Sequence, residues 1–290
     1  MPKLSICFAC HDDVEGAFFT LSSLRLHHLF KKQDVELVVA DDVPSKTPDL
    51  ENLCNLSGAK YHHVAINKGP AKAKQAAIEK TTGDYFLLVD SHVLLAPGSV
   101  DYMLQLIDNN MIGKNMIVGP LLNESCHIIA THLDERWRGD FFGTWNVDQD
   151  VTKGLIKEIP GSGSAYFLMK KEHWPGFNPN YEGFGGEELI SHEMVRQKGG
   201  KIYCHPKMGW IHRFVRGKPF TYKCDLIDKI YNYLIGFYSV GWCCDDVVEF
   251  FKKTPHAMWV PHAVQRATAL HPDLFEKTKN GKKFEHILNG

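Results

Sequence analysis

Short apolar segments alternate with helix-like segments through the N-terminal part of the chain, and this alternation limits the possible folds more than any other feature. The expected strands cover 4–8, 35–40, 60–65 and 85–89, and the expected helices cover 15–30, 50–56 and 71–80. Strands and helices that alternate at this spacing form a parallel sheet through right-handed crossover connections. The sequence therefore predicts an α/β fold with a Rossmann-like mixed, mostly parallel sheet flanked by helices.

Polar residues follow the carboxyl ends of these expected strands. They are His11-Asp12-Asp13, Asp41-Asp42, Asn67 and Asp90. The carboxyl ends of parallel strands lie at one edge of an open α/β sheet, which is where such sheets bind their ligands. The pattern therefore predicts a nucleotide-binding crevice along this edge.

The triplet Asp90-Ser91-His92 gives this crevice a chemical character. It closes the apolar run 85–89, which is typical of a buried strand. A carboxylate and an imidazole two residues apart can both reach one divalent cation, and this mixture of oxygen and nitrogen donors suits manganese or a similar metal. The alternative interpretation is a surface turn that contains Asp and His by chance, because so short a motif arises easily.

The remainder of the chain predicts further strands and then a helical tail. Expected strands cover 116–118, 165–169 and 201–204, and expected helices cover 100–109, 184–198, 225–240, 245–253 and 261–269. The change of pattern near residue 220 divides the chain into an α/β domain (1–219) and a helical C-terminal extension (220–290). Residues 123–158 are less regular. They contain aromatic and basic groups at Arg136-Trp137-Arg138, Phe141-Phe142 and Trp145, so we expect a loop close to a substrate.

Composition and charge disfavour several functions. The 290 residues carry a net charge of −1, so no overall field draws the protein to nucleic acid or to a membrane surface. No apolar segment approaches membrane-spanning length, and we expect no secretory signal because the N-terminus lacks a charged and then apolar region. The eight cysteines are scattered without C-x-x-C pairs, which predicts reduced thiols in a cytoplasmic protein.

Motifs that lie far apart in the sequence combine into a known pattern. They are Asp90 with His92, Gly185-Gly186-Glu187-Glu188, and His212. Together they resemble the family-two-like GT-A nucleotide-sugar glycosyltransferases, and among these most closely the catalytic domains of the polypeptide N-acetylgalactosaminyltransferases. The spacing agrees as well, since His212 follows Gly199-Gly200 by twelve residues and Lys74 precedes Asp90 by sixteen. The resemblance covers residues 3–215 and implies a GT-A fold, with 1–219 as the catalytic domain.

The resemblance also implies a cofactor and a donor. By analogy, Asp90, His92 and His212 hold Mn (or Mg) on the diphosphate of a UDP-sugar and leave coordination positions for two phosphate oxygens. Lys74 stands where the family carries an arginine that contacts the nucleotide, although a solvated lysine on an amphipathic helix is a competing interpretation. The implied nucleotide-sugar-binding residues are Ala9, His11, Asp12, Asp41, Asp42, Lys74, Ser91, Gly186 and Arg213, with Arg216 as a second basic candidate. One of the two residues Asp41 and Asp42 is expected to be a helix cap or turn former.

Glu187 and Glu188 are the expected catalytic residues. In inverting relatives the second acidic residue of this motif is a general base for the acceptor hydroxyl, whereas in the retaining N-acetylgalactosaminyl enzymes an asparagine stands there. Glu188 fits the inverting scheme chemically but is longer than aspartate, so the stereochemical outcome stays open. Adjacent carboxylates are also favoured at a helix start by the helix dipole, which is a sufficient structural reason for one of them.

The sequence thus predicts a metal-dependent glycosyltransferase that moves a hexose or N-acetylhexosamine from a UDP-sugar to an acceptor hydroxyl. The acceptor is unknown, and a cell-surface glycan precursor and a modified DNA base are both considered. Metal-dependent nucleotidyl transfer is an alternative, but the loop 9–16 is acidic where such enzymes carry glycine and basic residues. A non-catalytic nucleotide-sugar-binding protein is a further alternative.

Overall fold

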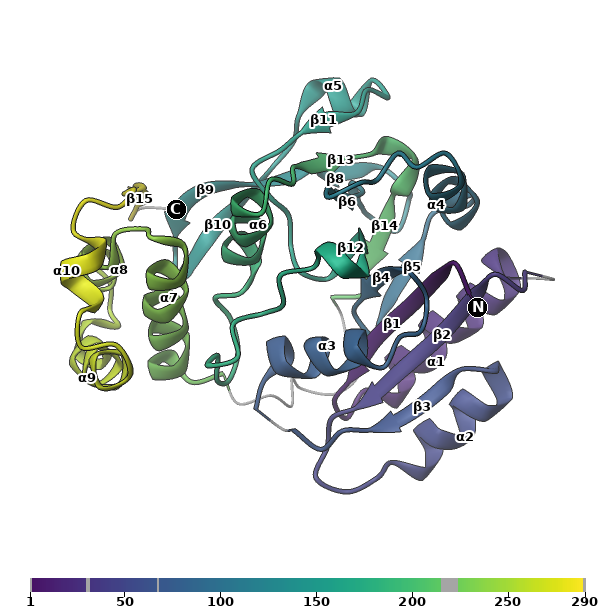
Figure 1. Ribbon diagram of the computed structural model, residues 1–290, viewed down its shortest axis with the longest axis horizontal. Helices are drawn as coiled ribbons and strands as arrows, with labels where there is room; N and C mark the ends of the chain where they lie inside the picture. Colours follow the sequence, from purple (N-terminus) through teal and green to yellow (C-terminus); the bar gives the residue numbers. More distant parts are fainter. Residues whose placement is uncertain (1, 30–31, 67, 215–223, 289–290) are drawn as a thin grey trace.

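The computed structural model describes residues 2–29, 32–66, 68–214 and 224–288 (Figure 1). Within these ranges an eight-stranded sheet forms the centre of the molecule. Its strands, in spatial order, are β11 (Lys157–Glu158), β13 (Ile202–Cys204), β6 (Met116–Val118), β12 (Tyr166–Lys170), β4 (Tyr85–Val89), β1 (Leu4–Cys10), β2 (Val35–Asp41) and β3 (Lys60–His63). The predicted α/β class is confirmed.

Most of the central sheet is parallel. β1 pairs in parallel with β2 and β4, β2 pairs in parallel with β3, and β6 pairs in parallel with β13. β12 is antiparallel to both β4 and β6, and the edge strand β11 is antiparallel to β13. The sheet is therefore mixed but mostly parallel, and the parallel neighbours β1, β2 and β4 direct their carboxyl ends toward the same edge.

Helices cover both faces of this sheet. Successive strand residues contribute to opposite apolar layers, so that Ile6 and Leu87 lie in one layer while Cys7 and Leu88 lie in the other. The first layer includes residues of α1 (Val14–Ser23), α2 (Pro48–Ser57) and α4 (Ser99–Asp108). The second includes residues of α3 (Pro70–Glu79), α6 (Glu188–Gln197) and the C-terminal helices. Burial on both faces explains why these strands are nearly continuous apolar runs in the sequence.

Smaller sheets flank the central one. One consists, in spatial order, of β5 (Val93–Leu95), β14 (Trp210–His212), β7 (Leu121–Leu122) and β8 (Ile128–Ala130), and another of β10 (Phe141–Asn146), β9 (His132–Arg138) and β15 (Glu285–Ile287). β14 is antiparallel to β5, and His212 lies opposite Val93. Because Val93 directly follows the turn that contains Asp90 and His92, this pairing brings His212 next to that turn.

The expectation of a loop close to the substrate over 123–158 is wrong for most of this region. It forms β8, the antiparallel hairpin β9–β10, the short helix α5 (Gln149–Thr152) and β11. Trp137 is completely buried, and its ring stacks on Phe250 at a centroid distance of 4.7 Å. Phe142 is buried beside it. The cause is packing against C-terminal helices that lie about a hundred residues away in the sequence, which local patterns do not reveal.

The C-terminal helices gather at one end of the molecule, opposite β1, β2 and β3 (Figure 1). They are α7 (Leu226–Val240), α8 (Cys244–Lys252), α9 (Val260–Leu270) and α10 (Leu274–Thr278). Residues of α7 and α8 share an apolar layer with residues of α6, and β15 pairs in parallel with β9. The division at residues 219 and 220 stays a prediction, but this tail shares its core with the α/β part.

Some elements differ in detail from the sequence-based expectations. The helix expected over 15–30 ends as α1 at Ser23 and continues as the π-helical segment η1 (Leu24–His28). Short 3-10 turns occur at η2 (Lys171–His173), η3 (Pro206–Met208) and η4 (Ala257–Trp259). Within the described ranges, the helices fall short of the length and apolar character needed to cross a bilayer.

Candidate functional site

Asp90, His92 and His212 lie together at the edge of the sheet where β4 ends. Asp90 and His92 belong to the turn between β4 and β5, and His212 ends β14, which pairs with β5. The Nε2 atoms of His92 and His212 are 3.2 Å apart, and His212 Nε2 lies 3.5 Å from a carboxylate oxygen of Asp90. Ligand atoms from the three residues all lie within 4.8 Å of one another, so one cation can contact all of them.

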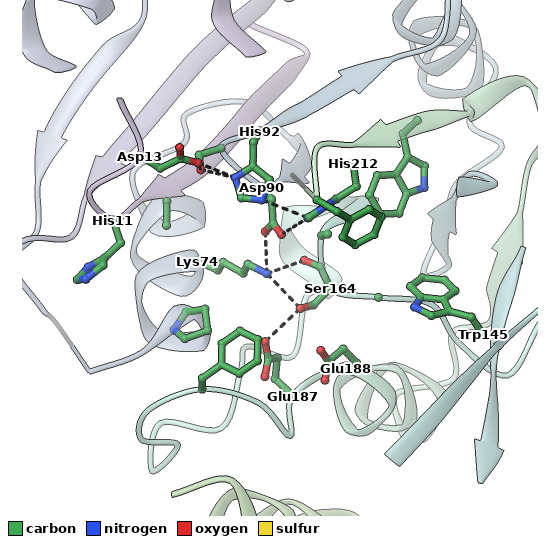
Figure 2. Close-up of a pocket in the computed structure, with 18 residues that line it drawn as sticks. His11, Asp13, Lys74, Asp90, His92, Trp145, Ser164, Glu187, Glu188 and His212 are labelled. Atoms are coloured by element: carbon green, nitrogen blue, oxygen red, sulfur yellow. Dashed lines mark hydrogen bonds and ion pairs between the residues drawn. The ribbon is translucent and has the colours of Figure 1, made fainter. Parts of the chain in front are cut away.

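The carboxylate of Asp13 contacts His92 on the far side of its ring (Figure 2). Asp13 Oδ2 lies 2.7 Å from His92 Nδ1 and accepts a hydrogen bond of 2.8 Å from the Ser91 hydroxyl. Burial raises the pKa of Asp13, but the hydrogen bonds from His92 and Ser91 outweigh it and hold the pKa below its ordinary value. With its Nδ1–H donated to a carboxylate, a neutral His92 directs the lone pair of Nε2 toward His212, as metal-binding imidazoles do.

The same contacts exclude a serine nucleophile at this position. Ser91 Oγ lies 3.0 Å from His92 Nδ1, which is also the ring nitrogen that contacts Asp13. In a Ser-His-Asp relay the hydroxyl and the carboxylate contact opposite nitrogens of the imidazole. Ser91 therefore has no separate nitrogen to which it can transfer its proton.

Lys74 connects the candidate ligand Asp90 to Ser164, which lies across the site. This buried side chain places Nζ 2.9 Å from an oxygen of Asp90 and donates to the main-chain oxygen and the hydroxyl of Ser164, at 3.1 and 3.2 Å. Burial lowers the pKa of Lys74, but the charge of Asp90 outweighs burial and the pKa lies above its usual value. Conversely, burial raises the pKa of Asp90 while Lys74 and His212 hold it far below its usual range. Both groups are therefore charged at neutral pH.

Glu187 and Glu188 form the opposite, acidic wall. Glu187 is the N-cap residue of α6, is almost completely buried, and accepts a 3.3 Å hydrogen bond from Ser164 Oγ. Glu188 follows as the first residue of the helix. Burial and the neighbouring charge of Glu187 raise the pKa of Glu188 to about 8. A carboxyl group of this kind can exchange a proton near neutral pH.

The acidic wall is held in place from behind by α7. Asn232 accepts a hydrogen bond from Glu182 N at 2.9 Å and donates to the carbonyl oxygens of Glu182 and Gly185, at 2.7 and 2.8 Å. Gly186 has a φ of 96°, and a Cβ added there would lie 2.9 Å from the Asn232 side chain. The C-terminal helical part therefore determines where the loop that leads to Glu187 and Glu188 lies.

A cavity of about 550 Å³ separates the two walls. Figure 2 shows Asp90, His92 and His212 along one side and Glu187 and Glu188 along the other, with Lys74 and Ser164 between them. The residues that line it are Ala9, His11, Asp13, Pro70, Lys74, Asp90, Ser91, His92, Trp145, Gly163, Ser164, Ala165, Phe184, Glu187, Glu188, Trp210, His212 and Phe214. The volume is in the range of pockets that bind small molecules and cofactors.

Several residues expected from the sequence to bind the nucleotide-sugar do not line this cavity. Asp12 is exposed in a turn with a φ of 50°, and Arg213 pairs with Glu15 at 2.7 Å. Gly186 faces α7, and Arg216 lies outside the described residues.

Asp41 and Asp42 are both completely buried and also lie away from the cavity wall. Asp41 accepts hydrogen bonds from Thr47 N at 2.9 Å and from the Tyr61 hydroxyl at 2.6 Å, so it stabilises the turn before α2. The main-chain oxygen of Asp42 lies 2.6 Å from Nδ1 of His11, which does line the cavity. Asp41 is thus the turn former that was expected of one of the two residues.

Sequence reasoning gave no site role to several residues that line the cavity, among them Asp13, Ser164, Phe184 and Phe214. Trp145 does line the cavity, as the expectation of a substrate-proximal segment implied. Asp13 belongs to the polar segment after β1, so a signal for it existed. The run Gly161–Ser164 before β12 was a second signal, because small residues at a strand start permit close approach of a ligand. No local pattern distinguishes Trp145 from the buried Trp137.

Comparison with known proteins supplies the family. A family model described as glycosyl transferase family 2 matches residues 10–159, slightly more than half of the chain. A polypeptide N-acetylgalactosaminyltransferase 5 from Mus musculus is 24% identical over an alignment of 273 residues, and the match covers 87% of this chain and 29% of the mouse protein. The chain thus spans less than a third of the length of this relative.

Solved structures share the fold at low sequence identity. GalNAc-T7, crystallised with UDP, GalNAc and Mn²⁺, gives a TM-score of 0.68 at 15% identity, covering 98% of this chain and 55% of its own. TarS from S. aureus (residues 1–349, in complex with UDP-GlcNAc) gives a TM-score of 0.56 at 14% identity, covering 92% of this chain and 73% of its own. These matches agree with the GT-A architecture expected from the sequence.

Proposed function

Since the chain belongs to glycosyl transferase family 2, we propose that it is a metal-dependent glycosyltransferase that moves a hexose or N-acetylhexosamine from a UDP-sugar to an acceptor hydroxyl. One observation carries the proposal. A single cavity has the candidate ligands Asp90, His92 and His212 on one wall and the buried acids Glu187 and Glu188 on the other. A donor diphosphate and an acceptor hydroxyl need these two chemistries side by side.

The donor set fits a divalent cation. One carboxylate and two imidazoles suit Mn²⁺, and Mg²⁺ is the alternative that oxygen ligands of a diphosphate favour. In this proposal Asp90, His92 and His212 hold the cation, which when bound supplies Lewis-acid stabilisation of the charge on the departing diphosphate. The presence of UDP and Mn²⁺ in the GalNAc-T7 structure supports this assignment.

The nucleotide-sugar lies, in this proposal, along the edge formed by Ala9, His11 and Ser91, which line the cavity at the ends of β1 and β4. Asp42 acts indirectly through its contact with His11. Lys74 adds a buried positive charge beside Asp90 that attracts a phosphate group.

Glu188 is the proposed proton acceptor for the acceptor hydroxyl. Its raised pKa makes it a stronger base than an exposed glutamate once it is ionised. Glu187 stays fixed by Ser164 and raises the pKa of Glu188 through its charge. In a retaining reaction Glu188 would bind the acceptor without removing its proton. The anomeric configuration of the product, read by nuclear magnetic resonance, decides between these roles.

The proposed compartment is the reducing cytoplasm, because the cysteines are scattered without C-x-x-C pairs and six of them are buried. The proposed acceptors remain a cell-surface glycan precursor and a modified DNA base. Mass spectrometry of both acceptor classes after incubation with donor and metal would identify the one that gains a sugar.

The central test is donor turnover. The purified chain is incubated with a panel of UDP-sugars and Mn²⁺, and release of UDP is measured. We expect one UDP-sugar to be hydrolysed slowly and Asp90→Asn to remove this activity, whereas the exposed Asp49→Asn retains it. Release of pyrophosphate instead of UDP would indicate nucleotidyl transfer. Binding without turnover of any donor or acceptor would indicate a non-catalytic binding protein, and both results contradict the proposal.

A further inference from the structure

We infer that Asp13 is a positioning residue for the cation site, because its carboxylate fixes the orientation and the tautomer of His92. The inference rests on the proposed cation bound by Asp90, His92 and His212. Asp13 contacts His92 at Nδ1, whereas Nε2 faces His212, so Asp13 acts on the cation site through the imidazole ring.

The two carboxylate oxygens of Asp13 have different partners. Oδ1 accepts a 3.1 Å hydrogen bond from Gly16 N and caps α1, whereas Oδ2 contacts His92 Nδ1 at 2.7 Å and the Ser91 hydroxyl at 2.8 Å. A carboxylate only accepts hydrogen bonds, so the proton of the neutral ring must reside on Nδ1. Nε2 is then the nitrogen with a lone pair, and it is the atom that faces His212 at 3.2 Å.

Helix α1 is built to hold this carboxylate. A Cβ added at Gly16 would lie 2.3 Å from Asp13 Oδ2, so any larger residue at this position displaces the carboxylate. One turn later, the buried Thr20 hydroxyl lies 2.9 Å from the Ser91 carbonyl oxygen and 3.0 Å from that of Val93, and it accepts from Val93 N at 2.9 Å. The helix therefore fixes both the ring of His92 and the main chain on either side of it.

Substitutions can separate the cap from the contact with the ring. Asn and Ser are both good N-cap residues, so Asp13→Asn and Asp13→Ser retain the cap of α1. The Asn amide presents a donor where Oδ2 was an acceptor, which favours the tautomer with the proton on Nε2. The Ser hydroxyl is too short to reach the ring. Gly16→Ala displaces the carboxylate while leaving Asp13 chemically intact, and Ala is otherwise favourable within a helix.

The first readout is the tautomer of His92 in the metal-free protein, measured from imidazole ¹⁵N chemical shifts. We expect the proton on Nδ1 in the wild type and on Nε2, or distributed over both nitrogens, in Asp13→Asn. A ring that keeps its Nδ1–H in Asp13→Asn and in Asp13→Ser contradicts the inference without any reference to metal binding.

The second readout is Mn²⁺ binding in the presence of UDP, measured by calorimetry. Loss of an outer carboxylate partner of a metal-binding histidine weakens metal binding by about 10- to 100-fold, and we expect this change for Asp13→Asn, Asp13→Ser and Gly16→Ala. Asp49→Asn, which removes an exposed first-turn acid of the neighbouring helix α2, is the matched control and should bind as the wild type does. Thermal unfolding checks that each variant is folded.

The outcomes separate this inference from the proposed function. If the wild type binds Mn²⁺ with UDP and the Asp13 and Gly16 variants bind it equally well, the role of Asp13 is refuted and the proposed function stands. If the wild type binds no divalent cation, the metal-dependent function is refuted. In that case the tautomer measurement still decides whether Asp13 controls the imidazole of His92.

Discussion

The Nε2 atoms of His92 and His212 lie 3.2 Å apart, although the two residues are separated by 120 positions in the chain. Their rings meet edge to face, at an interplanar angle of 89°. At this distance one of the two nitrogens can donate a hydrogen bond to the other, and a cation bound by both nitrogens would take the place of that proton. The contact is produced by the pairing of β5 with β14 and not by any local motif.

His212→Ala should therefore abolish the stabilisation of the protein by Mn²⁺ and UDP while changing the stability of the metal-free protein little. A ligand at a hundred times its Kd stabilises a protein by about 2.7 kcal/mol, which is easily measured as a rise in Tm. The check is a thermal shift with and without Mn²⁺ and UDP. An unchanged shift in the variant would show that His212 is not a ligand.

Lys74→Met should destabilise the metal-free protein. It leaves the Asp90 carboxylate without its cationic partner, and removal of one partner of a buried ion pair costs about 3–5 kcal/mol. Asp90 keeps some solvent contact, so the lower end of that range is expected. Because a bound cation replaces the missing charge, saturating Mn²⁺ should reduce the difference in the free energy of unfolding between the variant and the wild type, measured by urea unfolding. Lys80→Met, an exposed substitution just after α3, is the control, and an equal loss of stability in both variants contradicts the prediction.

Glu188→Gln should change how stability depends on pH. The pKa of Glu188 is raised to about 8 from 4.5, so the folded protein retains a proton that the unfolded chain releases between these values. The stabilising contribution of Glu188 is thus complete below pH 4.5 and is lost as the pH rises through about 8. Between pH 4.5 and about 8, the free energy of unfolding of the glutamine variant should rise relative to that of the wild type. Above about pH 8 the difference between the two should stay constant. Urea unfolding at several pH values measures this, with the exposed Glu124→Gln as control.

The same group predicts a pH profile for sugar transfer. If Glu188 is the proton acceptor, kcat/KM should rise with pH and level off near pH 8, and Glu188→Gln should lower kcat by about 100- to 10,000-fold. Mn²⁺ affinity should be unchanged in this variant because Glu188 lies across the cavity from the candidate ligands. A variant with normal kcat would remove Glu188 from the mechanism.

Asn232→Ala should reduce transfer more than it reduces metal binding. The substitution leaves main-chain groups of Glu182 and Gly185 without their partner, and each buried unsatisfied group costs about 1–3 kcal/mol. The loop before Glu187 then loses its support. The measurement is kcat beside the calorimetric Kd for Mn²⁺, with the exposed Asn55→Ala as control. Equal losses in kcat and metal affinity would indicate a general loss of folding instead.

The α/β class and the placement of Asp90 and His92 in the site could be predicted from the sequence. The fold class depends on local periodicity, and the two residues directly follow a buried strand. His212 could be placed only through the spacing of a family motif, since its position depends on long-range strand pairing. Asp41 shows the limit of the strand-end rule. It is the last residue of β2 and lies on the same face as Leu37 and Val39, so it turns toward α2 and away from the ligand edge.

Aromatic residues were harder to place than charged ones. Trp137 and Trp145 both belong to the hairpin β9–β10, yet Trp137 is buried against α8 while Trp145 reaches the cavity. The difference arises from which face of the hairpin the C-terminal helices cover. That information lies in the tail of the chain and not in the hairpin itself.

The two walls of the cavity rest on different apolar layers of the sheet. The turn with Asp90 and His92 is anchored by Val89 and Val93 in the layer of α1, whereas Glu188 is followed by Leu189 and Ile190 in the layer of α7. The apolar residues beneath the two walls are therefore separate, and the walls are joined by the polar contacts of Lys74 and Ser164. A change in the packing of α6 or α7 can therefore reach Asp90 through Ser164, which donates to Glu187 and accepts from Lys74.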